Sequence, residues 1–264
     1  MLSDVMEDYL KAIYVLQTES GPPVSTSAIA ERVGKTPPTV TSMLETLEDR
    51  GLVEREKYKG TELTEEGRTV ALEVLRHHRL LEAYLAEHLD YSWSEVHDEA
   101  DALEHHISEE FERRVAAALG DPAVDPHGDP IPGVDLEPPA DDDARPLTEV
   151  AVGDRVVIAR VSDRDDEELE YLDRAGITPG TTIEVLDVAP FGMVTVEVGP
   201  DSDEIVGAND DEGTDTSRDG TGSGAAADSG REQSLPETIA AAVRVRPVEE
   251  VNGAAATDAG VGGA

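Results

Sequence analysis

Four side chains that can bind metal ions recur within one short stretch of the chain at helical spacing. They are His97, Asp101, Glu104 and His105. On a helix that turns about 100° per residue, all four fall within an arc of about 100° and point to one side. Imidazole nitrogens and carboxylate oxygens form a donor set for a divalent cation. The spacing therefore predicts a metal site, and the alternative interpretation is a solvated acidic face.

A second pair of candidate ligands lies one helix earlier. His78 and Glu82 are four residues apart and share a helix face. The sequence has no cysteine, so His, Asp, Glu or Met must hold any metal, which disfavours Cu(I). His77 is expected at the surface, and His127 carries no specific signal. We expect an oxygen-rich site suited to Mn²⁺ or Fe²⁺ and a second site with two nitrogens and one oxygen. The first comprises Asp8, Asp101, Glu104 and one imidazole, and the second comprises His78, Glu82 and His97.

The elements that precede these ligands have the order of a winged helix-turn-helix. Apolar residues recur at helical spacing, turns are marked by glycine, and Thr36 is placed as an N-cap before a proline. Two short strands then flank a turn. This plan is typical of DNA-binding domains. The predicted elements are helices over 3–18, 26–33 and 37–50 and strands over 52–55 and 61–64.

The third of these helices is the predicted recognition helix. Its outer side carries small polar and apolar side chains that can contact phosphates and thymine methyl groups. It has no Arg or Asn in its first two turns, so readout is expected to depend on DNA shape. Basic residues beside it are expected phosphate contacts, unless they pair with the nearby Glu54, Glu56 and Glu62. The predicted DNA contacts are Lys35, Thr36, Pro38, Thr39, Ser42, Arg55, Lys57 and Lys59.

Two long helices are predicted to follow, over 65–89 and 94–119, with a possible break near Ser108. Ser92 and Glu95 form a capping-box pattern at the start of the second helix. Paired long helices beside a winged domain commonly form a dimer interface. We therefore expect a homodimer.

The C-terminal part has β character. Strands are expected over 156–161, 182–188, 193–198 and 242–246, with a short helix over 166–175. This pattern fits a small SH3-like barrel. Residues 200–234 are rich in Asp, Gly, Ser and Thr and cannot bury a core, which predicts a disordered insertion.

The charge of the chain bears on its partners. Its net charge of −38 would ordinarily argue against DNA binding. Acidic residues occur in segments that look folded as well as in loops, and lysine is scarce. This composition resembles that of halophilic, haloarchaeal-type cytoplasmic proteins, in which concentrated salt screens the repulsion between like charges. Residues 1–68 carry 13 acidic and 8 basic side chains, so they are the least acidic part. No run of 18 apolar residues and no signal-peptide pattern occurs, so we expect a cytoplasmic protein without a membrane segment.

Several motifs together resemble the diphtheria toxin repressor and manganese transport regulator family of metal-dependent repressors. The resemblance is strong over about residues 3–135 and weaker in a C-terminal part that is similar to the family's FeoA-type SH3-like domain. The most specific motif is the proline- and glycine-rich stretch 126–133. The matching stretches are 6–10, 30–32, 38–40, 51–53, 63–67, 96–100, 104–105 and 126–133.

The resemblance implies roles for individual residues. Asp8, Asp101, Glu104 and His105 match the family's principal metal site, and His78, Glu82 and His97 match its second site. Asp165 and Glu168 match ligands from the SH3-like domain more loosely. Iron-type members carry Met and Cys where this chain has Asp8 and Asp101, and manganese-type members carry Glu where it has Lys11. An ammonium cannot be a ligand, which argues against the binuclear manganese arrangement.

We therefore predict a multidomain α+β protein that is not an enzyme. We expect divalent Fe²⁺ or Mn²⁺ to act as co-repressor and the dimer to bind a palindromic double-stranded operator. The resemblance implies that metal-uptake genes are repressed. One alternative is a winged-helix regulator of a non-metal signal, and another is a metal-dependent hydrolase, although no His-Glu-x-x-His motif occurs. The SH3-like domain could instead bind a protein. The predicted boundaries are 1–67 (DNA binding), 68–135 (dimerisation and metal), 136–147 (linker), 148–250 (SH3-like) and 251–264 (disordered tail).

Overall fold

The computed structural model describes residues 2–56, 59–139, 143–199 and 230–248. Two compact units make up the chain. The first comprises Met1–Asp143 and Arg160–Pro179, and the second comprises Ala144–Ala159 and Gly180–Ala264. Within the described residues no helix is both long and apolar enough to cross a membrane.

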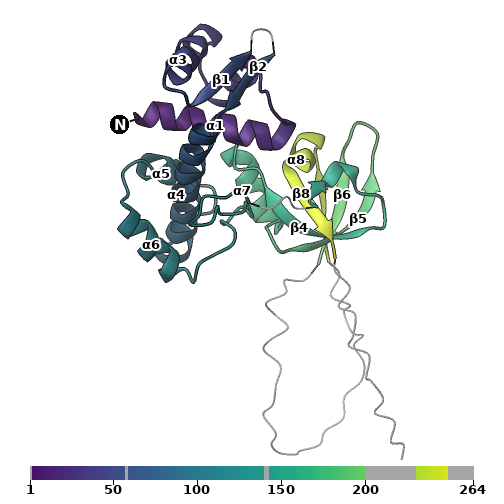
Figure 1. The fold of residues 1–264 in the computed structure, drawn as a ribbon. Coiled ribbons are helices and arrows are strands. Elements are labelled where there is room, and N and C mark those ends of the chain that lie inside the picture. Colours follow the sequence, from purple (N-terminus) through teal and green to yellow (C-terminus); the bar gives the residue numbers. More distant parts are fainter. Residues whose placement is uncertain (1, 57–58, 140–142, 200–229, 249–264) are drawn as a thin grey trace, which may run out of the picture. The chain divides into compact units, whose positions relative to one another are not determined.

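The first unit begins with the predicted winged helix-turn-helix (Figure 1). It consists of α1 (Asp4–Ser20), α2 (Thr26–Arg32), α3 (Pro37–Asp49), β1 (Val53–Glu56) and β2 (Gly60–Leu63). The two strands pair antiparallel, and Val24 adds a bridge to Thr61 at the edge of the ribbon. The side chains of Leu10, Ile13 and Leu44 are fully buried where the helices meet. These apolar stripes are the ones that the helical spacing predicted.

The N-cap of α3 differs in detail from the prediction. Thr36 has the extended backbone of an N-cap, but its side chain caps no amide of the helix. Its hydroxyl instead lies 2.9 Å from the hydroxyl of Thr39. Pro37 and Pro38 supply no amide hydrogens, so the start of the helix has fewer donors that need a cap.

Helix α4 (Glu65–Leu89) extends from the winged domain into the helical part of the unit, with the bounds that the sequence predicted. Thr64 caps it by accepting a hydrogen bond from the amide of Gly67 at 3.0 Å. A Cβ atom at Gly67 would lie 1.9 Å from the carbonyl oxygen of Leu52. Glycine therefore permits the close approach of α4 to the β-ribbon. Val70 and Ala71 of α4 share the apolar core of α1.

The second long helix of the prediction is two helices, α5 (Val96–Leu103) and α6 (Glu109–Ala118). The sequence predicted one helix over 94–119 with a possible break near Ser108; the chain does turn at residues 104–108, so the break is confirmed and a continuous helix is not. Ser108 accepts a hydrogen bond from the amide of Phe111 and caps α6. Three glutamates in the first turn of α6 suit the positive end of its dipole. The Ser92–Glu95 contact exists, but it lies in the turn before α5, where the Ser92 amide donates to the Glu95 carboxylate at 3.1 Å.

A loop after α6 folds back onto α4. Arg79 donates to the carbonyl oxygen of Pro130, and Arg76 donates to that of Pro132, both at 2.6 Å. The Asp125 carboxylate accepts hydrogen bonds from the amides of His127 and Asp129 at 2.9 Å each. These contacts hold the loop in a fixed turn beside α4. The last element of the first unit is α7 (Asp166–Ala175), which was predicted and which ends at Gly176 in the left-handed conformation.

The second unit contains a six-stranded sheet in the order β3-β8-β4-β5-β6-β7. This small β domain confirms the predicted fold class. Its core includes the fully buried Ile158, Ile183 and Val196. The bounds are β3 (Arg145–Pro146), β4 (Arg155–Val161), β5 (Thr182–Val188), β6 (Val194–Val198), β7 (Arg231–Leu235) and β8 (Val243–Pro247), with η1 (Leu147–Glu149) and α8 (Glu237–Ala242). The last residues of β4 belong to the first unit.

Strand β7 corrects the predicted disordered insertion over 200–234. Residues 231–235 pair along β6, from Val198↔Arg231 to Val194↔Leu235. The sequence did not predict this strand because its residues are mostly polar. They lie on an edge strand, where polar side chains reach solvent, while Leu235 is buried. Residues 200–229 and the predicted tail 251–264 lie outside the described residues.

Candidate metal centre

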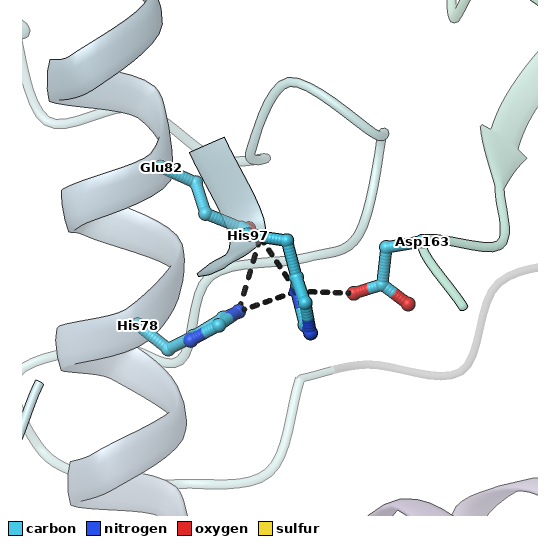
Figure 2. A group of neighbouring side chains, drawn as sticks. All are labelled: His78, Glu82, His97 and Asp163. Atoms are coloured by element: carbon cyan, nitrogen blue, oxygen red, sulfur yellow. Dashed lines mark hydrogen bonds and ion pairs between the residues drawn. The ribbon is translucent and has the colours of Figure 1, made fainter. Parts of the chain in front are cut away.

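A cluster of four side chains forms where α4, α5 and the segment after β4 meet within the first unit (Figure 2). Helix α4 supplies His78 and Glu82 one turn apart, α5 supplies His97, and the segment before α7 supplies Asp163. We call this group the histidine cluster. His78 and Glu82 are almost completely buried, whereas His97 and Asp163 are partly exposed. An ion could therefore reach the cluster from the side of His97 and Asp163.

The spacing of the donor atoms fits a metal ion. The Glu82 Oε1 atom lies 3.0 Å from His78 Nε2 and 3.2 Å from His97 Nδ1. The two ring nitrogens are 3.2 Å apart, and Asp163 Oδ2 lies 3.3 Å from His97 Nδ1. Ligands bound about 2.0–2.2 Å from one ion stand about 3.0–3.5 Å from each other in compact coordination. Two imidazoles and two carboxylates suit Fe²⁺, Mn²⁺ or Zn²⁺.

Two buried polar atoms beside the cluster have no hydrogen-bond partner among the described residues. They are Glu82 Oε2 and His127 Nδ1. His127 lies on the loop that Arg76 and Arg79 hold, and its other ring nitrogen is 3.0 Å from the carbonyl oxygen of Trp93. Its Nδ1 lies 3.8 Å from Glu82 Oε1. Glu82, Asp125 and His127 form a further buried group with metal-ligand spacing. Burying a polar atom without a partner costs free energy, which a bound cation would offset.

The electrostatics of the histidine cluster place protons where an ion would bind. Burial alone would lower the pKa of His97, but hydrogen bonds to Asp163 and Glu82 raise that pKa to about 10. Burial would likewise lower the pKa of His127, but the Glu82 carboxylate raises it to about 9. Burial would raise the pKa of Asp163, but its hydrogen bond to His97 lowers it to about 2. Without metal the carboxylates are ionised and the imidazoles hold protons, which a metal must displace.

A second cluster joins the first helix to the turn after α5. Asp8 comes from α1, and Glu104 and His105 come from the turn. The His105 Nε2 atom lies 2.8 Å from Asp8 Oδ1 and 3.3 Å from Glu104 Oε1. Glu104 is fully buried, and Asp8 is about half exposed. We call this group the helix-1 cluster.

Neighbouring side chains orient the imidazoles of both clusters. The Nδ1 atom of His105 lies 2.8 Å from Glu7 Oε2. In the same way, His78 Nδ1 lies 2.6 Å from Glu104 Oε2, while its Nε2 belongs to the histidine cluster. A carboxylate that accepts the hydrogen of one ring nitrogen leaves the other nitrogen free to bind a metal. His78 and Glu104 therefore connect the two clusters directly.

Asp101 was predicted with Asp8, Glu104 and His105, but its side chain contacts Lys11 and His78. Asp101 Oδ1 lies 2.8 Å from Lys11 Nζ and 3.2 Å from His78 Nδ1. Burial would lower the pKa of Lys11, but Glu104 and Asp101 raise it above its usual value. Lys11, which the sequence excluded as a ligand, thus lies inside the carboxylate group as its positive partner.

The structure also changes the assignment of the C-terminal donors. Asp165 caps α7 by accepting hydrogen bonds from the amides of Glu167 and Glu168 at 3.0 Å. Among the described residues neither Asp165 nor Glu168 belongs to a group with metal-ligand spacing. Asp163, which the sequence did not single out, occupies that position instead. Nothing in the sequence distinguishes it from the acids that follow it, because its contact with His97 spans 66 residues.

Two histidines also lie elsewhere than the sequence indicated. His77 was expected at the surface, but it is buried, and its Nδ1 lies 3.1 Å from the carbonyl oxygen of Glu104. His127, which carried no signal, is fully buried beside Glu82. The proline-rich loop fixes its position, and such a contact cannot be inferred from helical spacing.

The predicted DNA contacts lie mostly on the surface of the winged domain. Lys35, the N-cap residue Thr36 and the α3 residues Pro38, Thr39 and Ser42 are exposed. Arg55 lies 3.4 Å from Glu48, and Lys59 lies 2.6 Å from Glu56. The alternative interpretation named Glu54, Glu56 and Glu62 as partners of the basic residues, and of the two pairs only Lys59–Glu56 matches it. Lys57 lies outside the described residues.

Three family models match the chain. Residues 1–61 match the family described as iron dependent repressor, N-terminal DNA binding domain. Residues 64–133 match iron dependent repressor, metal binding and dimerisation domain, and residues 145–210 match the FeoA domain. The second match contains every residue of the two clusters except Asp8 and Asp163.

Curated proteins and solved structures agree with these matches. The iron-dependent repressor IdeR of Mycobacterium tuberculosis is 36% identical over 208 residues, covering 75% of this chain and 90% of the relative. The diphtheria toxin repressor of Corynebacterium diphtheriae is 36% identical over 196 residues, covering 70% and 86%. A structure titled manganese-dependent transcriptional repressor complex with manganese superposes with a TM-score of 0.76 at 35% identity, covering 92% of this chain and 100% of that one.

Proposed function

This chain belongs to the family of iron-dependent, DNA-binding repressors, and we propose that the histidine and helix-1 clusters hold the divalent ions that control its binding to DNA. The family is regulated by iron or manganese, so the ion is Fe²⁺ or Mn²⁺. The donors of both clusters are nitrogen and oxygen, which both ions accept. When bound, the ion supplies positive charge that draws ligands from separate elements together.

The observation that carries this proposal is the convergence of four donors in the histidine cluster. The Nδ1 atom of His97 lies 3.2–3.3 Å from a donor atom of each of the other three residues, and Glu82 Oε1 lies 3.0 Å from His78 Nε2. The Glu82 carboxylate is a buried charge whose Oε1 faces the imidazoles of His78 and His97, while its Oε2 has no hydrogen-bond partner among the described residues. Charges of this kind are rarely buried unless they are paired or coordinate a metal.

The helix-1 cluster links the ion to DNA binding. Asp8 lies on α1, whose apolar face packs in the core of the winged domain, whereas Glu104 and His105 lie in the helical part. An ion bound between them fixes α1 relative to α4 and α5, and with it the exposed face of α3. The bound state then favours the arrangement that is competent to bind DNA.

The family dimerises through its metal-binding and dimerisation domain. We propose that the dimer presents two α3 helices to successive major grooves of a palindromic operator, as helix-turn-helix dimers do. The chain acts by binding rather than by catalysis, and it acts in the cytoplasm, where its DNA lies. The domain boundaries proposed from the sequence, including a DNA-binding domain at 1–67, stay part of this proposal.

The proposal is tested by selecting DNA duplexes from a randomised library with the full chain, Mn²⁺ and molar KCl. Fluorescence anisotropy on the selected duplex then compares Mn²⁺, anaerobic Fe²⁺ and chelator. We expect chelation to abolish binding, and Glu82→Gln to weaken the metal response. Glu73→Gln, an exposed substitution on the same helix, is the matched control and should behave as wild type. Equal DNA binding before and after chelation would exclude the ion as co-repressor.

A further inference from the structure

The ammonium group of Lys11 lies inside a ring of acceptor atoms that could themselves bind a metal. Its Nζ atom is 2.8 Å from Asp101 Oδ1, 2.7 Å from Glu104 Oε1 and 2.8 Å from Glu104 Oε2. The Lys11 side chain is only 17% exposed. Three short charge-assisted hydrogen bonds to one buried ammonium form a complete set of partners for that cation.

The same oxygens also belong to groups with metal-ligand spacing. Together with His78, Asp101 and Glu104 form one such group, and Glu104 is shared with Asp8 and His105 in the helix-1 cluster. A divalent ion bound to Asp101 and Glu104 would therefore compete with the Lys11 ammonium for the same oxygens. Both cations cannot occupy the group, because like charges at such short distances repel strongly.

We propose that Lys11 is a built-in cation that occupies the His78–Asp101–Glu104 group in place of a metal ion. This inference rests on the proposed function, because it concerns the same site. Asp101 is then the partner of Lys11 rather than a metal ligand. The helix-1 cluster takes its ion through Asp8, Glu104 and His105.

Lys11 has a second consequence for regulation. It lies on α1, as Asp8 does, while Asp101 and Glu104 belong to α5 and the turn that follows it. The Lys11 contacts therefore tie α1 to the helical part without metal. A fixed positive charge that shares Glu104 with the metal weakens metal binding, so Lys11 sets the metal concentration at which the protein responds.

The experiment compares Lys11→Met with wild type, with Arg50→Met as the control because Arg50 is an exposed basic residue of the winged domain outside the predicted DNA contacts. Bound Mn²⁺ is counted by elemental analysis after dialysis, and affinity is measured by calorimetry on the full chain. We expect Lys11→Met to bind one more ion per chain, or to bind Mn²⁺ at least about tenfold more tightly. We also expect thermal unfolding of its metal-free form at a lower temperature, with a larger rise on adding Mn²⁺ than in wild type.

A second variant keeps the test decisive if Lys11→Met fails to fold. Asp101 is about half exposed, so Asp101→Asn removes its charge with little effect on the core. If Lys11 is the partner of Asp101, this variant keeps the wild-type number of ions. Loss of an ion from Asp101→Asn, or an unchanged count and affinity in folded Lys11→Met, would overturn the inference. Failure of the wild type to bind both Mn²⁺ and anaerobic Fe²⁺ would instead refute the proposed function.

Discussion

Asp163 provides the most discriminating test of the histidine cluster, because the sequence pointed to Asp165 instead. We expect Asp163→Asn to weaken Mn²⁺ binding and Asp165→Asn to leave it unchanged. Asp163 Oδ2 lies 3.3 Å from His97 Nδ1, whereas Asp165 accepts two amide hydrogen bonds at the start of α7. Asparagine also caps helices well, so Asp165→Asn is a matched control that preserves the local fold.

The size of the effect follows from the charge that is removed. The scale is that of one carboxylate charge beside one unit of positive charge. At an effective dielectric constant of about 20, two such opposite charges about 3.3 Å apart attract each other by about 5 kcal/mol. Asp163 is 29% exposed, so solvent screening reduces this to about 1–3 kcal/mol. The expected loss is about 10- to 100-fold in affinity, since about 1.4 kcal/mol corresponds to a factor of ten.

The assay is a competition titration in which a fluorescent chelator and the full chain share a limited amount of Mn²⁺. Circular dichroism of both variants verifies that they fold as the wild type does. If Asp165→Asn lost affinity and Asp163→Asn did not, the assignment of the cluster from its geometry would be refuted.

Three further predictions concern other parts of the first unit. Glu7→Gln should lower Mn²⁺ affinity at the helix-1 cluster by about tenfold in calorimetry, because Glu7 orients an imidazole ligand. The exposed substitution Glu31→Gln on α2 should leave this affinity unchanged, and equal effects of the two variants would contradict the role of Glu7. The pKa of His97 is raised to about 10 in the metal-free protein. Protonation of His97 therefore stabilises the metal-free fold: this stabilisation is complete below the usual histidine pKa of about 6.5 and is lost as the pH rises through about 10. Titration should therefore show Mn²⁺ affinity rising between about pH 6 and 8.5, and a flat profile would count against imidazole ligands. Gly67→Ala should lower the free energy of unfolding in urea by about 1–3 kcal/mol, because its Cβ would meet the Leu52 carbonyl; unchanged stability would show that this contact relaxes freely.

The parts of the fold that depend on local patterns were predictable from the sequence. The bounds of α4 follow from its apolar spacing and from Thr64, whose hydroxyl caps the helix. His78 and Glu82 could be paired because one helical turn brings them together. The break at residues 104–108 was harder to place, because Glu104 and His105 continue the helical spacing of His97 although α5 ends at Leu103.

The remaining features depend on contacts between distant segments. Lys11 meets Glu104 across 93 positions, and Asp163 meets His97 across 66. The strand β7 exists because β6 offers an open edge, and its own residues do not signal a strand. Sequence spacing reports on one helix or strand at a time, so it identified the residue types of the metal centre but not all of its members.

The most direct test of the account is an anomalous-diffraction measurement on crystals grown with Mn²⁺. We expect one anomalous peak bounded by His78 Nε2, Glu82, His97 Nδ1 and Asp163, and a second bounded by Asp8, Glu104 and His105, with Lys11 retained beside Asp101. A crystal saturated with Mn²⁺ that shows no anomalous density for an ion at the first position and none at the second would contradict this assignment of the metal centre.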